Sequence, residues 1–264
     1  MKSYTLLALA LGSMTLFAGC DTVNQIASMQ TGNTTIGNTG TGNTGTGNTA
    51  GNTTASVTTA EMSSGIKQAL GNGLTTSINT LSVTDGFLGN AAVKILMPAE
   101  AQKIEKTLRA VGMGKLCDQF IQSLNRAAET AVKEAAPVFV NSLSQMTITD
   151  AYNILLSGQQ DAATTFFKRT TSAALASKFS PIVASALGKN NVSTYWSQLT
   201  TAYNAIPLAS EKVNTDLNAY VTQKAINGLF TQVASEELKI RSNLSGARNT
   251  NLLQKVFGYA DTKK

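Results

Sequence analysis

Residues 215–243 read TDLNAYVTQKAINGLFTQVASEELKIRSN, a stretch with helical spacing that is apolar around more than half of its circumference. A helix of this kind is normally surrounded by other elements, so we expect it to be the central helix of the domain. Glu237 points into its apolar half, and Arg241 follows four residues later, the order that favours an ion pair. The sequence predicts a structural ion pair here, with a polar ligand contact as the alternative.

The segments before and after this helix repeat the helical pattern, and no convincing run of alternating strand residues interrupts them. We therefore predict an all-α fold, a single multi-helix domain over residues 61–264 with nine or ten helices. A short extended piece is expected at residues 93–97. The expected helices cover residues 59–81, 98–112, 114–135, 137–146, 147–158, 161–179, 181–188, 193–206, 215–243 and 249–258.

Polar residues at the edges of the predicted helices suggest a site. Asn125 and Glu129 border the apolar stripe of the helix at 114–135, and Arg169 flanks an aromatic helix from which it could reach Glu129 or Glu237. Ionisable groups that gather in one place are candidates for function. The predicted polar cluster consists of Asn125, Glu129, Arg169, Glu237 and Arg241.

Gly228 lies inside the predicted central helix, where glycine costs about 1 kcal/mol relative to alanine. A residue without a side chain allows another element to approach closely. We expect a neighbouring helix to pack against Gly228, and room for a ligand is the alternative.

The chain has no histidine and only two cysteines, Cys20 and Cys117. Without histidine, the Ser-His-Asp and Cys-His catalytic arrangements and most zinc, haem and non-haem iron sites are excluded. Cys117 lies at the centre of a helical apolar stripe, which favours a buried small hydrophobe over a reactive thiol. We expect no cofactor, no metal and no catalytic residue.

An enzyme would have to use other groups. Ser64 and Lys67 match the Ser-x-x-Lys element of penicillin-recognising enzymes, and residues 123–125 match their Ser-x-Asn element, but the Lys-Thr-Gly element is missing. Carboxylates could form an acid-base pair, although nothing in the sequence fixes their separation. These carboxylates are Asp118, Glu129, Asp150 and Glu237.

The N-terminus resembles a lipoprotein signal peptide. Lys2 supplies the positive region, a short apolar run follows, and Ala18-Gly19 are the small residues that precede a cleaved bond. The run is too short to span a bilayer. A plain secretory signal is the alternative, but small residues directly before Cys20 favour removal of residues 1–19 and acylation of this cysteine.

Two or three acyl chains anchor a protein stably, so we expect a lipid-anchored protein of the bacterial cell envelope that faces the periplasm. Asp21 resembles the inner-membrane retention signal of enteric bacteria, and the choice between inner and outer membrane stays open. Residues 20–60, with their Gly-Asn-Thr repeats, are too polar to form a core and predict a flexible linker. Its expected average reach is about 35 Å.

The formal charge of +6 is scattered, with basic residues adjacent only at Lys168-Arg169 and Lys263-Lys264. Nucleic-acid binders gather such residues on one face, so we expect no nucleic-acid partner. Weak attraction to anionic lipid headgroups is the better interpretation, which makes the membrane the expected partner.

Several short motifs resemble, in order and with the expected spacing, the bacterial domain-of-unknown-function family forty-one ninety-seven. The resemblance runs from about residue 61 to residue 258 and implies an exported, mostly helical domain with no established activity, so no catalytic residue is carried over. The motifs are DGFL (85–88), GMGK (112–115), NRAAE (125–129), DA (150–151), YVTQKA (220–225), GLF (228–230), EE (236–237) and KVFG (255–258).

Three functions are compatible with these observations. The first is an interaction or scaffolding module on a tether, which could bind another envelope protein. The second is a binding protein for a small amphiphilic ligand, and the third is an enzyme that uses carboxylates or Ser-Lys chemistry. The amphiphile would occupy an inter-helix pocket lined by apolar residues that could equally be core. These residues are Phe166, Phe167, Trp196, Leu229 and Phe230.

Overall fold

Helix α9 (Leu217–Arg241) occupies the predicted central position and packs against α2, α4 and α7. The computed structural model describes residues 57–205 and 216–263, so the predicted signal peptide, Cys20 and most of the predicted linker lie outside the described residues. Within those ranges the protein has nine α-helices and no strand, which confirms the all-α prediction. The other helices are α2 (Thr59–Leu81), α3 (Gln102–Ala110), α4 (Gly114–Val132), α5 (Ala136–Gln145), α6 (Ile148–Leu156), α7 (Ala162–Lys189), α8 (Val192–Asn204) and α10 (Asn251–Asp261).

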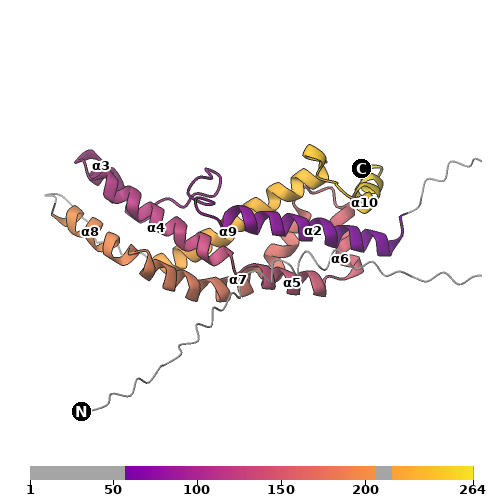
Figure 1. The fold of residues 1–264 in the computed structure, drawn as a ribbon, viewed down its shortest axis with the longest axis horizontal. Coiled ribbons are helices and arrows are strands. Elements are labelled where there is room, and N and C mark those ends of the chain that lie inside the picture. Colours follow the sequence, from indigo (N-terminus) through magenta and orange to yellow (C-terminus); the bar gives the residue numbers. More distant parts are fainter. Residues whose placement is uncertain (1–56, 206–215, 264) are drawn as a thin grey trace, which may run out of the picture.

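The helices form an elongated body (Figure 1). Helices α3, α4 and α8 gather toward one end, and α2, α6 and α10 gather toward the other. Helices α7 and α9 pass between the two ends and contact each other along their length. Each of them touches helices at both ends, so they connect one continuous apolar core.

Helix α2 begins earlier than the expected end of the linker at residue 60. Thr58 accepts a hydrogen bond from the Glu61 amide at 3.2 Å, and the Glu61 carboxylate accepts one from the Thr58 amide at 2.8 Å. This reciprocal cap satisfies two backbone donors that the first helical turn leaves without partners. Residues 58–60, assigned to the linker from composition, therefore belong to the folded domain.

The expected break at Pro181 does not occur, because α7 continues through it as one helix. A proline inside a helix removes one backbone donor and costs about 3 kcal/mol. Leu175, Phe179 and Val183 lie on one face at four-residue spacing across the proline, and all three are fully buried. Packing of this uninterrupted face offsets the local cost.

Residues 82–98 form a non-helical segment between α2 and the short 3₁₀ turn Ala99–Ala101. Its Phe87 is fully buried and lies against Gly228, where an added Cβ would come within 2.6 Å of the ring carbon Cε1. The close neighbour of Gly228 is therefore this segment. The sequence suggested a neighbouring helix at this position, and that prediction is wrong. No ligand is needed to explain the glycine.

Cys117 is fully buried in α4, as predicted. Burial raises the pKa of its thiol, because the thiolate would lose its hydration. The reactive form is therefore disfavoured, which agrees with a packing role.

Candidate functional site

The five residues of the predicted polar cluster fall into three groups according to their contacts. Asn125 and Glu129 hold the 82–98 segment, Glu237 and Arg241 pair on α9, and Arg169 lies on the surface of α7. The carboxylates of Glu129 and Glu237 are bonded to other partners, so Arg169 meets neither of them. The structure therefore does not unite the predicted cluster in one place.

Asn125 acts as a backbone partner for the 82–98 segment. Its side-chain oxygen accepts from the Ile95 amide at 2.8 Å, and its nitrogen donates to the carbonyl oxygens of Ile95 at 2.8 Å and Ile121 at 2.7 Å. These bonds satisfy the polar groups of a buried extended residue that no strand pairs with. The role of Asn125 in the described contacts is structural.

Glu129 serves the same segment at its other end. Its carboxylate accepts from the Phe87 amide at 3.2 Å and from Arg126 at 2.7 Å, and Arg126 also binds Asp85 at 2.8 Å. Asp85 has a positive φ of 65°, a conformation uncommon outside glycine, so the ion pair secures a tight turn. The contribution of Arg126 was not evident in the sequence, because this residue lies opposite the apolar stripe of α4.

Glu237 and Arg241 form a buried ion pair, with 2.8 Å between Arg241 Nη2 and Glu237 Oε1. Both side chains are less than a tenth exposed. The ion pair predicted from the sequence is present, and the space beside it measures only about 10 Å³. That is about the room of a single water molecule and cannot admit an organic ligand.

The pair also joins two other helices. The Glu237 carboxylate accepts from the amides of Ala163 at 2.9 Å and Thr164 at 2.8 Å, at the N-terminus of α7. Arg241 donates to the carbonyl oxygen of Ile154 at 2.8 Å, near the C-terminus of α6. An anion at a helix N-terminus and a cation at a helix C-terminus are the favourable arrangement for both helix dipoles. One pair therefore positions α6 and α7 relative to α9.

Most of the apolar residues proposed for an amphiphile pocket belong to the core. Phe167 and Phe230 both pack edge-on against Phe139, with ring centroids 5.4 and 6.3 Å apart, and Leu229 is fully buried. Trp196 stacks on Phe120 at 5.3 Å. Phe166 also lines a hollow at the surface.

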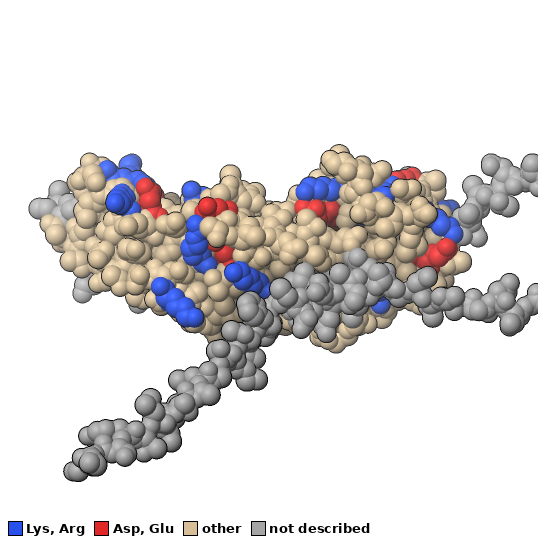
Figure 2. Space-filling model, viewed as in Figure 1, with Lys and Arg blue, Asp and Glu red and all other residues tan. Residues whose placement is uncertain are grey.

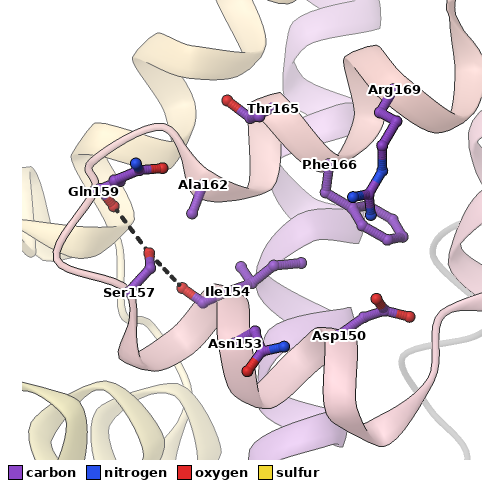
Figure 3. A pocket seen from close by; sticks show the side chains of 9 residues that line it. All are labelled: Asp150, Asn153, Ile154, Ser157, Gln159, Ala162, Thr165, Phe166 and Arg169. Atoms are coloured by element: carbon purple, nitrogen blue, oxygen red, sulfur yellow. Dashed lines mark hydrogen bonds between the residues drawn. The ribbon is translucent and has the colours of Figure 1, made fainter.

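That hollow lies between α6 and α7 and has a volume of about 280 Å³ (Figure 3). We call it the α6–α7 hollow. Its lining residues follow helical spacing on both helices, so one face of each helix forms a wall. From α6 and the following turn come Asp150, Asn153, Ile154, Ser157 and Gln159, and from α7 come Ala162, Thr165, Phe166 and Arg169.

The two walls are fixed by the contacts described above. Ile154, on the α6 wall, gives its carbonyl oxygen to Arg241, and Ala162 and Thr165 flank the two residues whose amides bind Glu237. Ser157 closes the turn by donating to the carbonyl oxygen of Ile154 at 3.2 Å. The hollow is therefore a preformed feature supported by the buried pair and its partners.

Opposite charges line the α6–α7 hollow. The Arg169 guanidinium lies 5.7 Å from the centroid of the Phe166 ring, and Figure 3 shows it extending toward the side where Asp150 lies. Thr147 donates to Asp150 Oδ2 from its hydroxyl at 2.6 Å and from its amide at 3.0 Å. These bonds, with a smaller effect of the Arg169 charge, lower the pKa of the Asp150 carboxyl. Asp150 is therefore ionised at neutral pH.

Other hollows on the described surface are less specific. One is lined by residues of α4 and α7 and includes a single charged side chain, Lys189. Another lies beside α2 and α9 and includes a single charged side chain, Glu236, which Lys239 neutralises at 2.8 Å. The α6–α7 hollow alone among the three combines both signs of charge with an aromatic wall.

Sequence reasoning missed part of this site. Asp150 was noticed as a carboxylate and Arg169 as a member of the polar cluster, but nothing linked them to Asn153. The signal available was the i, i+3, i+7 spacing of Asp150, Asn153 and Ser157, followed by the same spacing in Ala162, Thr165 and Arg169. This pattern marks two facing helix walls only once the helices are known to be neighbours.

The charged side chains on the described surface are of both signs. On the face shown in Figure 2, basic and acidic side chains lie beside one another. Ion pairs among the described residues include Arg126 with Asp85 and Arg109 with Glu105. The described residues contain no group of three acidic or cysteine side chains placed to hold a metal ion. No helix within 57–205 and 216–263 is both long and apolar enough to cross a membrane.

Comparison with known proteins gives one match. A family model described as "Protein of unknown function (DUF4197)" matches residues 56–258, which confirms the resemblance noted from the sequence motifs. The matched range includes α2 through most of α10 and both walls of the α6–α7 hollow. Neither a curated protein nor a solved structure matches the chain.

Proposed function

This chain belongs to the DUF4197 family of proteins of unknown function, and we propose from its own residues that it is a lipoprotein of the bacterial cell envelope whose helical domain is an interaction module. Acylated Cys20 is the membrane anchor, and the domain that begins at Thr58 faces the periplasm. The polar segment between them is a tether that allows the domain to search for a partner over a few tens of Å.

The observation that supports an interaction function best is the exposed face of α6. Ile148 and Tyr152 lie one turn apart on this helix and are 56% and 44% exposed, and neither of them lines the α6–α7 hollow. Aromatic side chains are enriched in protein interfaces, and the buried centre of an interface is more apolar than the rest of the surface. The space beside the buried ion pair is far smaller than the α6–α7 hollow, because packed side chains fill this part of the interior.

The anchor predicts a defined N-terminus and a loss of membrane attachment when Cys20 is replaced. We expect mass spectrometry of the protein extracted from membranes to show a chain that begins at Cys20 and bears added acyl mass. Cys20→Ala should abolish that species and release the cleaved protein from the membrane fraction. Cys117→Ala is the matched control, because it removes the other thiol without touching the anchor. A cleaved Cys20→Ala protein that stays in the membrane fraction would contradict the proposal.

The interaction module predicts a specific neighbour at α6. We expect a photoreactive phenylalanine analogue placed at Tyr152 to yield one discrete crosslinked protein in intact cells. The same analogue at Val111, which is 58% exposed and ends α3 at the other end of the body, is the control and should not yield that product. Absence of a specific product at Tyr152, or the same product at both positions, would rule out α6 as the interaction face.

A further inference from the structure

The α6–α7 hollow offers one cationic and one anionic side chain that are not joined in an ion pair. Among the residues that the structure describes, Arg169 has its contact with the Phe166 ring and makes no hydrogen bond to a carboxylate. Asp150 uses Oδ2 for Thr147, while Oδ1 accepts no hydrogen bond from the described residues. Both groups therefore retain bonding capacity on the side of the hollow.

The Arg169 end suits an anionic oxygen group. A guanidinium presents planar, parallel donors that match a carboxylate or a phosphate, and its stacking on an aromatic ring limits its rotation. Phe166 is 8% exposed, and the Arg169 guanidinium lies over its ring. An anion bound here would gain two charge-assisted hydrogen bonds without any rearrangement of the wall.

The Asp150 end suits a cationic donor. Its carboxylate is held in place by the two bonds from Thr147, so it is oriented before a ligand arrives. Asn153 follows one turn later on the same wall and adds an amide that can accept or donate. Figure 3 shows both side chains on α6, across the hollow from Phe166 and Arg169.

Next to the two charged side chains, toward the turn between α6 and α7, the surface is apolar (Figure 3). Ile154, Ala162 and the edge of Phe166 contribute to it, and their burial leaves a small hydrophobic strip open to the hollow. A volume of about 280 Å³ lies just below the usual range of about 300–1,000 Å³ for small-molecule sites. The ligand is therefore comparable in size to an amino acid.

From this arrangement we propose that the α6–α7 hollow binds a small zwitterion, whose anionic group pairs with Arg169 and whose ammonium group pairs with Asp150. A simple anion would meet the repulsion of Asp150, and a simple cation would meet that of Arg169, so the hollow selects against both. The inference goes beyond the interaction module and does not depend on the membrane anchor.

Two kinds of molecule in the cell envelope carry an anionic group and an ammonium group together. One is a free apolar amino acid, and the other is the phosphoethanolamine group of a lipid, which also joins an anion to an ammonium group. Both present the same charges to Arg169 and Asp150, so the two sources are distinguished by direct measurement.

Isothermal titration calorimetry of the full-length chain in a non-ionic detergent tests the proposal. The probes are leucine and glycerophosphoethanolamine, together with N-acetyl-leucine and leucine amide, each of which lacks one of the two charges. We expect one of the two zwitterions to bind. If it is leucine, blocking either charge should weaken binding about tenfold or more. If only glycerophosphoethanolamine binds, the ligand is the lipid headgroup.

Variants assign the binding to the hollow. Arg169→Gln and Asp150→Asn are each expected to weaken binding of the zwitterion about tenfold or more, and Asp150→Asn keeps an oxygen that can accept from Thr147. Lys168→Gln, which removes one positive charge from the adjacent exposed position, should bind as the unmodified protein does. Because Arg169 is exposed, Arg169→Gln remains informative even if Asp150→Asn reduces folding.

The proposal is overturned if neither zwitterion binds at millimolar concentration, or if Arg169→Gln retains the full affinity. A protein crosslinked at Tyr152 would be unaffected by either result, since that experiment reports on the outer face of α6. Failure of the ligand site and failure of the interaction face are thus separate outcomes.

Discussion

Replacing Glu237 or Arg241 alone is expected to lower the free energy of unfolding by about 3–5 kcal/mol, because each change leaves the other partner charged and buried. Glu237 accepts from Arg241 Nε at 2.9 Å, from the amides of Ala163 and Thr164, and from the Thr164 hydroxyl at 2.8 Å. Gln in its place offers one acceptor where two oxygens now serve several donors. Arg241→Met removes the neutralising charge and leaves the Ile154 carbonyl without this donor.

The double variant Glu237→Gln/Arg241→Met is expected to lose much less than the sum of the two single variants Glu237→Gln and Arg241→Met. Removing both charges also removes the cost of their desolvation, so replacing a buried pair by apolar residues is often nearly neutral. The remaining loss comes from the donors of α7 and the Ile154 carbonyl, which still need partners. Such non-additivity is expected because the Glu237 and Arg241 side chains are in direct contact.

Denaturant unfolding of the four proteins, followed by circular dichroism, measures these differences. Glu134→Gln is the control, because Glu134 and Lys178 form an exposed pair 3.7 Å apart, whose side chains are 48% and 40% exposed. Exposed pairs contribute about 0–1 kcal/mol, so this variant should be close to the unmodified protein. Additive effects of the two α9 substitutions would show that the pair is not coupled.

Asn125→Ala is the second large effect that we expect, with a loss of about 2–6 kcal/mol of unfolding free energy. The substitution leaves the amide and the carbonyl of Ile95 buried without their partner, and each such group costs about 1–3 kcal/mol. Asn125 itself is fully buried, so water cannot replace the lost bonds without opening the structure. The 82–98 segment should therefore detach from α4 more often.

Two measurements detect the loss of the Asn125 hydrogen bonds. Denaturant unfolding reports the global loss, and the rate of trypsin cleavage after Lys94, an exposed residue beside Ile95, reports local opening. Ser123→Ala is the control on the same helix, since the buried Ser123 hydroxyl only donates to the Phe120 carbonyl of its own helix at 2.7 Å. It should cost about 1 kcal/mol and leave cleavage unchanged. Equal cleavage rates in the two variants would contradict the assigned role of Asn125.

The sequence by itself determined the class of the fold and the position of its central helix. The apolar circumference of residues 215–243 predicted a surrounded helix, and α9 contacts α2, α4 and α7. A helix was also predicted over residues 147–158, and Thr147 caps α6 through reciprocal bonds with Asp150. These features depend on residues three or four positions apart, which interact as soon as a helix forms.

The pairing of Glu237 with Arg241 was accessible for the same reason, because both residues lie on one helix. The partners that give this pair its importance were not, since Ala163 is 74 residues from Glu237 in the sequence. The continuity of α7 through Pro181 likewise depended on the neighbours that bury Phe179 and Val183. Local preference indicated a break, and packing outweighed it.

Only the tertiary structure decided which polar residues meet. Arg169 was expected near Glu129 or Glu237, yet it lies on the α6–α7 hollow with Asp150, and Asn125 and Glu129 hold a non-helical segment instead. A helical pattern shows which face of each helix is apolar, but it leaves open which other face lies opposite. That choice depends on how the nine helices of the described residues fill one core together, because the energy of burial depends on all of their contacts at once.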